Sequence, residues 1–331
     1  MRFALMIFAA WAGAAVARAQ MFILPTPNRA LIADGALSEK YLVGTTGKPW
    51  QSGGYGCVRS EGFKMHEGLD IRCTQRDKRG EPIDPVVASA AGTVAYINNK
   101  PGLSNYGRYI VIRHNIEGLE ICTLYAHLSE IQDGLAIGQT VKQGQRIATM
   151  GRSTNTREGI SKDRAHLHFE FDFILNDRYA AWHKQYLVGQ RNDHGDWNGF
   201  NLAAIDPAPL LLAAAREGTN FSLLKHVQSR KEVCRVLVRD TKFSFLRHYP
   251  ALIKQKPEIK DVRSYAIALD FNGAPIELIP YGEPKSPTKV QLLNVNEAEL
   301  AEHPCSHLIV TRKGRRQLGN AGDQRVSLLT Y

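Results

Sequence analysis

The segment Ala165–Phe171 constrains the fold more than any other part of this chain. Its polar residues, His166, His168 and Glu170, alternate with apolar ones over seven positions. A period of two is typical of a β-strand with one face in the core, so both imidazoles leave the sheet on the same side. They are separated by about 6 to 7 Å. The pattern therefore predicts paired histidines, of which one can bind a metal ion while the other reaches a bound substrate.

A second segment supplies further metal-binding side chains. His66 and Asp70 lie on either side of Gly68 in Met-His-Glu-Gly-Leu-Asp-Ile, which suits a turn entering a strand better than a helix. Two imidazoles and one carboxylate are a ligand set that holds catalytic zinc and leaves a fourth position for water. We therefore expect these residues to meet the strand histidines around one zinc ion per chain. Glu67 adjoins a ligand, but the glycine turn predicts that it points into solvent.

The segment Ile121–Leu128 contributes a further histidine. Thr123, Tyr125 and His127 are expected on one face of a strand. His127 is then a candidate catalytic residue, and Tyr125 a candidate for supporting a ligand or binding substrate. Glu170 is a candidate for orienting an imidazole, with a carboxylate at the rim of the site as the alternative. A lone histidine is usually an ordinary core or surface residue, and it is the combination that favours a site.

These motifs resemble those of the LytM/lysostaphin-type zinc metallopeptidases, which cut peptide bonds in bacterial cell walls. The similarity runs from about Pro49 to Leu212. The segments that carry it are Gly-Tyr-Gly-Cys at 54–57, His-Glu-Gly-Leu-Asp-Ile at 66–71, Val-Val-Ala-Ser-Ala-Ala-Gly-Thr-Val at 86–94, Ser-Asn-Tyr-Gly at 104–107, Tyr-Ala-His-Leu at 125–128, Gly-Gln-Thr-Val-Lys-Gln-Gly-Gln at 138–145, His-Leu-His-Phe-Glu at 166–170 and Asp-Pro at 206–207. An insertion of about thirty residues between Phe173 and Ile205 departs from the family, and we expect a surface loop or a wall of the substrate groove.

The resemblance implies a mainly β fold in which an antiparallel β-sheet forms the peptidase groove. It implies that His66, Asp70 and His168 bind Zn²⁺, and that His127 and His166 serve catalysis without being primary ligands. Because no His-Glu-x-x-His glutamate is present, we hypothesise that these two histidines divide two tasks. One accepts the proton of water and the other hydrogen-bonds the oxyanion, in an order that stays open.

The expected function is that of a zinc metalloendopeptidase that hydrolyses peptidoglycan peptides, in cross-links or stem peptides, by metal-activated water. Some members of the family have lost metal ligands and act only by binding or activating other wall hydrolases, whereas this chain keeps every position. A non-hydrolytic wall-binding or activator module that uses the same groove is the alternative. The sequence does not indicate which bond is cut, or whether the enzyme acts as an endopeptidase or a carboxypeptidase. It also leaves the oligomeric state open.

The N-terminus predicts export. Arg2 precedes an apolar run over 3–16 and then Ala17-Arg18-Ala19, an A-x-A cleavage signal. We expect residues 1–19 to be a signal peptide cleaved near Ala19, and the mature protein to be secreted or periplasmic. No segment offers the roughly 20 apolar residues of a membrane span, and nucleic acid is not an expected partner of an exported chain.

Five cysteines suit an oxidising compartment, and their odd number leaves one unpaired. Cys122 is the expected free thiol, because it alternates with Leu124 and Ala126 on the side of its strand that faces the core. We expect the pairs Cys57–Cys73, beside the metal-binding turn, and Cys234–Cys305.

We divide the chain into a signal peptide (1–19), an N-terminal extension that packs on the peptidase (20–48), the zinc peptidase domain (49–218) and a smaller, basic α+β domain of unknown role (219–331). The last range carries 18 Lys and Arg against 11 Asp and Glu, whereas residues 20–218 carry 22 against 21. This excess charge could attract an anionic wall, and an ordinary solvated surface is the alternative.

In the first part we expect strands over 86–97 with a glycine turn at 91–92, and over 109–114, 121–127, 146–150 and 165–173, with a helix over 207–216. In the C-terminal part, Asn272-Gly273 predicts a hairpin of 265–271 with 275–280. Asn296 and Glu299 occupy capping-box-like positions for a helix over 296–303. Strands are expected over 307–311 and 325–330.

Overall fold

The structure, a computed structural model, describes residues 20–282 and 289–331. The expected signal peptide, residues 1–19, lies outside the described residues. Within the described part, no helix combines the length and the apolar character that crossing a bilayer requires. The sheets are built from antiparallel strand pairs, which confirms the expected mainly β fold.

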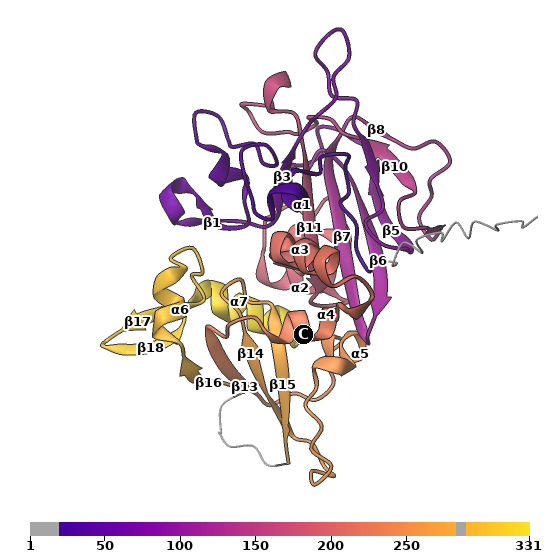
Figure 1. The fold of residues 1–331 in the computed structure, drawn as a ribbon. Coiled ribbons are helices and arrows are strands. Elements are labelled where there is room, and N and C mark those ends of the chain that lie inside the picture. Colours follow the sequence, from indigo (N-terminus) through magenta and orange to yellow (C-terminus); the bar gives the residue numbers. More distant parts are fainter. Residues whose placement is uncertain (1–19, 283–288) are drawn as a thin grey trace, which may run out of the picture.

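A seven-stranded sheet forms the centre of the first part of the chain (Figure 1). Its strands run in the order β12-β11-β7-β6-β5-β9, and β3 pairs with β11 beside β12. Their bounds are β3 Leu69–Arg72, β5 Gly92–Asn98, β6 Arg108–Ile116, β7 Leu119–Leu128, β9 Thr140–Val141, β11 His166–Ile174 and β12 Leu202–Ile205. β11 is buried along its whole length, because β7 covers one edge and β3 and β12 share the other.

Two small sheets accompany the large one. β1 (Gly56–Arg59) pairs with β2 (Lys64–His66), and β10 (Arg146–Thr149) lies between β4 (Pro85–Val87) and β8 (Glu130–Ile131). The expected strand over 86–97, with its glycine turn, is therefore two strands that belong to different sheets. The chain leaves the small sheet after β4 and enters the large sheet as β5.

The C-terminal part contains a four-stranded sheet in the order β15-β14-β13-β16. Its bounds are β13 Cys234–Val238, β14 Ser264–Leu269, β15 Pro275–Tyr281 and β16 Val290–Val295, and a separate hairpin pairs β17 (Ile309–Arg312) with β18 (Arg315–Leu318). The hairpin predicted around Asn272-Gly273 is confirmed by the pairing of β14 with β15, and Gly273 has the positive φ of +77° that such turns require.

The helices are short. They are α1 Ala30–Asp34, α2 Tyr179–Tyr186, α3 Pro207–Glu217, α4 Leu223–Gln228, α5 Phe245–His248, α6 Glu297–Glu302 and α7 Asn320–Leu329. The predicted helices over 207–216 and 296–303 are confirmed by α3 and α6, whose N-cap side chains, Asp206 and Asn296, accept backbone N–H groups.

The strand expected over 325–330 is wrong, since residues 325–329 belong to α7 and Thr330 is its C-cap. Val326 and Leu328 are both buried, and this short alternation suggested a strand. Gly322, Val326 and Leu329 are also buried, at helical spacing, and they form the face that packs into the protein. The six residues 325–330 are too few to distinguish the two-residue period of a strand from the 3.6-residue period of a helix.

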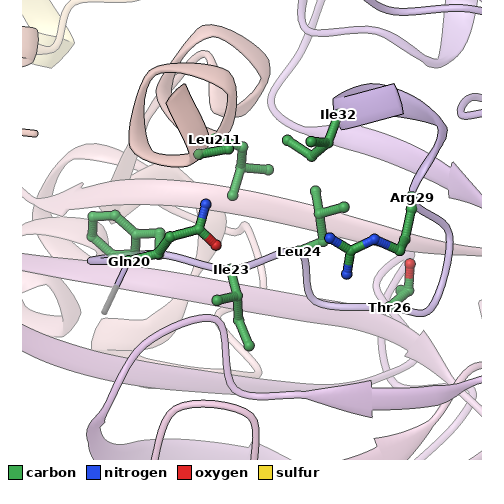
Figure 2. Close-up of a pocket in the computed structure, with 9 residues that line it drawn as sticks. Gln20, Ile23, Leu24, Thr26, Arg29, Ile32 and Leu211 are labelled. Carbon is green, nitrogen blue, oxygen red and sulfur yellow. The ribbon is translucent and has the colours of Figure 1, made fainter. Parts of the chain in front are cut away.

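One continuous apolar core joins the two parts of the chain. Leu167, Phe169 and Phe171 of β11 belong to the same buried cluster as residues of α4 and of the four-stranded sheet. The segment 20–48 also packs on the first part, and the Phe22 ring meets Phe171 at a centroid distance of 4.8 Å. Between this segment and α3 lies a small pocket of about 160 Å³ (Figure 2). The division into domains stays a prediction.

The disulfide joins Cys57 to Cys305, residues separated by 248 positions. Cys73, Cys122 and Cys234 are free and buried. The free state of Cys122 is confirmed, and both expected pairs are wrong. Two cysteines bond only where the fold brings their Cα atoms within about 7 Å, and here the fold brings β1 next to the C-terminal part. Spacing along the sequence held no information about this approach.

Candidate metal centre

The turn between β2 and β3 brings the first two predicted ligands to β11. Asp70 of β3 pairs directly with His168 of β11 in the ladder. His66 ends β2 just before the turn, and Glu67 lies exposed in it. The turn approaches β11 so closely that a Cβ atom on Gly68 would lie 2.4 Å from the Phe169 carbonyl oxygen. Only glycine permits this approach, which is why it stands between the two predicted ligands.

The three predicted ligands converge. Oδ1 of Asp70 lies 3.0 Å from Nδ1 of His168 and 3.2 Å from Nε2 of His66, and these two nitrogens are 3.2 Å apart. Tetrahedral zinc, with bonds of about 2.0 to 2.1 Å, places its ligand atoms ~3.3 Å apart. The three atoms therefore form a triangle of the size of one face of a zinc tetrahedron. The donor set and its spacing fit zinc.

Hydrogen bonds fix the rings of both ligand histidines. Nδ1 of His66 donates to the Gly54 carbonyl at 2.6 Å, so its Nε2 faces the centre. His168 has the opposite arrangement, because its Nε2 donates to Oε1 of Glu170 at 2.5 Å and leaves Nδ1 for the centre. Such bonds to the outer nitrogen set tautomer and orientation in metal-binding histidines. Glu170 thus bonds the outer nitrogen of His168, and its orienting role stays a prediction.

The centre attracts positive charge. Arg59 bonds Oδ2 of Asp70 at 2.6 Å and leaves Oδ1 for the imidazoles. Burial favours the neutral form of Asp70, but the surrounding imidazoles outweigh it and hold the pKa of the carboxyl well below its usual range. Burial likewise opposes protonation of His168, yet the carboxylates of Asp70 and Glu170 outweigh it and raise its pKa to about 10. A site that holds a proton this strongly suits a divalent cation.

His127 and His166 face the centre without joining the triangle. Their ring centroids are 4.9 Å apart, and Nε2 of His166 lies 3.4 Å from Oδ1 of Asp70. Nδ1 of His127 donates to the Ser153 carbonyl at 2.9 Å, and Nδ1 of His166 donates to the Arg164 carbonyl at 2.6 Å. In both rings Nε2 is therefore the nitrogen that remains free. Burial lowers the pKa of both rings, assisted at His127 by the neighbouring imidazoles. Both are therefore neutral at pH 7 and suited to accept a proton.

Thr123 and Tyr125 share a face, as expected, and Thr123 Oγ1 donates to the Tyr125 hydroxyl at 3.0 Å, but the expectation that His127 shares it is wrong. Tyr125 pairs with Phe169 and lies on the core side, where its hydroxyl accepts the Ser89 N–H at 2.8 Å. β7 contains one extra residue opposite β6, and His127 has a positive φ of +61°. This bulge turns His127 to the metal side of the sheet. Tyr125 consequently does not contact the centre.

Asp172 was missed, although it continues the alternation of β11 beyond Glu170. Its carboxyl is fully buried, and neither oxygen has a hydrogen-bond partner in the described part of the chain. Burial, and then the charge of Glu170, raise the pKa of Asp172 well above its usual range, whereas the pKa of Glu170 is lowered. Of this pair Asp172 holds the proton and Glu170 is the carboxylate. Arg59 was also missed, and nothing in its sequence context signalled its role.

The insertion after β11 covers an aromatic cluster beside the centre. Nδ1 of His194 lies 2.9 Å from the Tyr96 hydroxyl, and the Tyr109 hydroxyl donates to the Trp197 carbonyl at 3.0 Å. Tyr106 belongs to the same cluster and donates to Oε1 of Glu170 at 2.9 Å. The insertion therefore packs behind a residue that orients a ligand, and His194 itself is outside the ligand group.

An open cleft lies beside His127. It has a volume of about 550 Å³ and is lined by two loops, with residues Pro101, Gly102, Arg152, Ser153, Thr154, Glu158, Gly159, Ile160 and Ser161. Ser153 is also the residue whose carbonyl holds the His127 ring. The same loop thus lines the cleft and holds the candidate catalytic ring of His127.

A second group of possible metal ligands lies on and after α6. It comprises Glu299, Glu302 and His303. Nζ of Lys231 lies 3.3 Å from carboxylate oxygens of both glutamates. An ammonium group already balances their charge, so this group is an ion-pair cluster.

Comparison with known proteins assigns the family. Residues 64–180 match the model of Peptidase family M23. The catalytic domain of the antimicrobial peptidase lysostaphin from Staphylococcus simulans is 24% identical at a TM-score of 0.28, over 48% of this chain and 88% of that one. An uncharacterized metalloprotease of Haemophilus influenzae is 40% identical over 109 residues, 33% of this chain and 19% of the relative.

Several relatives carry the name NlpD. The murein hydrolase activator NlpD of Escherichia coli is 37% identical over 110 residues, which span 33% of this chain and 23% of that protein. The lipoprotein NlpD of Yersinia enterocolitica is 36% identical over 99 residues, 29% of this chain and 86% of the relative. The chain thus spans less than a third of the length of the Haemophilus and Escherichia proteins. It belongs to peptidase family M23, which confirms the resemblance found in its motifs.

Proposed function

We propose that the chain is a zinc-dependent peptidase that hydrolyses peptide bonds of peptidoglycan. The observation that carries the proposal is the orientation of three imidazoles around one oxygen of Asp70, with the His127 ring beside two of them. Each ring donates one N–H to a protein oxygen and turns its other nitrogen toward the same centre. Hydrogen bonds of this kind preorganise ligands and proton acceptors before any metal or substrate arrives.

The division of work follows from the geometry. His66, Asp70 and His168 would hold zinc, which would act there as a Lewis acid on a peptide carbonyl and would lower the pKa of a water molecule to about 7. His127 and His166 lie next to this triangle with Nε2 free, and one of them accepts the proton of the attacking water. The other would take a proton from solvent at Nε2 and then donate a hydrogen bond from this nitrogen to the developing oxyanion.

The cleft beside His127 supports binding of an extended peptide. Its lining includes the small polar side chains of Ser153 and Thr154. A strand-like peptide bound there would lie against the loop whose Ser153 carbonyl holds the His127 ring. That the peptide belongs to peptidoglycan is supported by membership of family M23 and by a relative named as a murein hydrolase activator.

The proposed location is outside the cytoplasm, as a secreted or periplasmic protein. The Cys57–Cys305 disulfide is of the kind that persists in oxidising compartments. Relatives named as lipoproteins support the same location.

A second candidate function is activation of another wall hydrolase without hydrolysis. The relative named as a murein hydrolase activator favours it. The complete and preorganised ligand set favours hydrolysis, since a surface that only binds does not require it.

Digestion of purified sacculi tests the two functions. We expect soluble muropeptides to be released by the zinc-loaded protein, release to stop with 1,10-phenanthroline, and to return when zinc is added back. His66→Ala should be inactive, whereas His226→Ala, a control on α4, should be active. Mass spectrometry of the products identifies the bond. Release only after a second wall hydrolase is added would establish the activator function instead.

A further inference from the structure

The β1–β2 hairpin carries part of the metal centre, yet it lies outside the central sheet. In the described structure the two strands pair only with each other. β2 ends at the ligand His66, and Arg59 at the end of β1 bonds Oδ2 of the ligand Asp70. The position of the hairpin therefore determines where one ligand lies and how another is oriented.

The C-terminal part of the chain holds this hairpin. Cys57 of β1 is bonded to Cys305, whose backbone N–H also donates to the Cys57 Sγ at 3.2 Å. Beyond the turn, Nε2 of His307 donates to the Phe63 carbonyl at 3.1 Å. Figure 1 shows β1 next to the region of α6, β17 and β18. Residues 305–307 therefore contact the hairpin at two separate points.

Apolar packing adds a third contact at the base of the hairpin. The Phe271 ring meets Tyr55 edge to face at a centroid distance of 5.8 Å. Its Cζ atom lies 3.8 Å from where a Cβ on Gly56 would be. Phe271 is in turn stacked on His303 at 3.8 Å. The disulfide therefore closes a packed interface.

On the other side, an ion pair holds the turn of the hairpin. Nζ of Lys48 lies 2.6 Å from Oε1 of Glu61, and both side chains are more than half exposed. Exposed pairs contribute little to stability. The firmer contacts of the hairpin away from the metal centre are therefore those with the C-terminal part.

We propose that the Cys57–Cys305 disulfide positions the metal centre, so that zinc affinity depends on the bond being formed. This inference rests on the proposed zinc site. Bond formation removes two protons and two electrons from the two thiols, and a small disulfide such as oxidised glutathione accepts them and becomes two thiols. In the reduced chain the hairpin spends time away from β3 and β11, and His66 and Arg59 move with it. Affinity falls with the fraction of molecules in which all ligands are assembled.

Zinc affinity of the purified protein, measured by competition with a chromogenic chelator, tests this inference. We compare the oxidised native protein, the double variant Cys57→Ala/Cys305→Ala and the control Cys234→Ala, which removes a buried free thiol on β13. We expect the double variant to bind zinc ~10-fold more weakly or worse, and the control to match the native protein. Backbone hydrogen exchange should rise first over residues 54–66.

Reduction of the native protein with a phosphine, followed by desalting under nitrogen, breaks the same bond without substitution. The reduced native protein takes the place of the double variant if that variant does not fold. Oxidised glutathione should then restore the zinc affinity of the reduced protein. Phe271→Ala, which keeps the bond but removes the packing on Tyr55, should weaken zinc binding to a smaller degree. A purely structural role would lower the unfolding temperature and leave the zinc affinity of the folded protein unchanged, and this result would overturn the inference. Absence of zinc binding by the oxidised native protein would instead refute the proposed function.

Discussion

Nε2 of His168 donates a hydrogen bond to Oε1 of Glu170, two residues further along the same face of β11. The same oxygen accepts the hydroxyl of Tyr106. Because this bond occupies Nε2, it leaves Nδ1 of His168 to face Asp70. The alternation of the strand therefore places the predicted ligand and also selects the nitrogen that it presents.

Glu170→Gln should weaken zinc binding ~10- to 100-fold, because a neutral amide accepts a weaker hydrogen bond from the His168 ring. Chelator competition measures the change. Glu158→Gln, in an exposed loop, is the matched control and should bind zinc as the native protein does. Equal affinity of the two variants would show that Glu170 does not support the ligand.

His127→Ala and His166→Ala should each keep one zinc per chain and lose hydrolysis ~10²- to 10⁴-fold, because neither ring belongs to the ligand triangle and both face it. Elemental analysis reports the zinc content, and muropeptide release reports turnover. Full turnover by His166→Ala with its zinc retained would contradict the assigned roles.

Tyr125→Phe should leave hydrolysis unchanged and lower the free energy of unfolding by about 1 to 3 kcal/mol, because the buried Ser89 N–H loses its acceptor. Urea unfolding and sacculus digestion measure the two effects. Loss of hydrolysis at unchanged stability would mean that Tyr125 acts on the substrate after all.

Acid should destabilise the protein through His114. This ring is buried between the Ala91 carbonyl and the Thr123 hydroxyl, and burial lowers its pKa to about 4. The neutral His114 ring contributes fully to the free energy of unfolding above pH ~6.5, the pKa of histidine in the unfolded chain. This contribution is lost as the pH falls toward 4, because the unfolded chain then binds a proton that the folded protein does not. Between pH 7 and pH 5 the loss amounts to ~2 kcal/mol. Urea unfolding at both values should show this loss in the native protein and a smaller one in His114→Gln.

Gly68→Ala should abolish zinc binding, because the added Cβ would lie 2.4 Å from the Phe169 carbonyl oxygen and force β3 away from β11. Gly102→Ala is the control, since a Cβ there meets nothing within 4 Å. Zinc titration of both variants checks the expectation. An alanine at 68 that left zinc binding intact would show that the turn can relax.

The ligand geometry was predictable where one strand or one turn determines it. Alternation along β11 placed His166 and His168 on one face, because successive side chains of any strand point to opposite sides. Asp172 obeys the same rule and could have been included. The face of the sheet on which His127 lies could not be predicted, because a bulge in β7 turns this side chain to the other face. The bulge depends on the register of β7 against β6, which the residues of β7 alone do not indicate.

What the sequence determined by itself was the family, the β character of the first part and the candidate ligand and catalytic histidines, since these depend on motifs and on the two-residue period of a strand. Only the tertiary structure decided that Cys57 pairs with Cys305, that Arg59 meets Asp70 and that Tyr125 turns into the core. Each of these depends on segments that meet after folding, and such meetings follow from the packing of the whole chain rather than from the order of neighbouring residues.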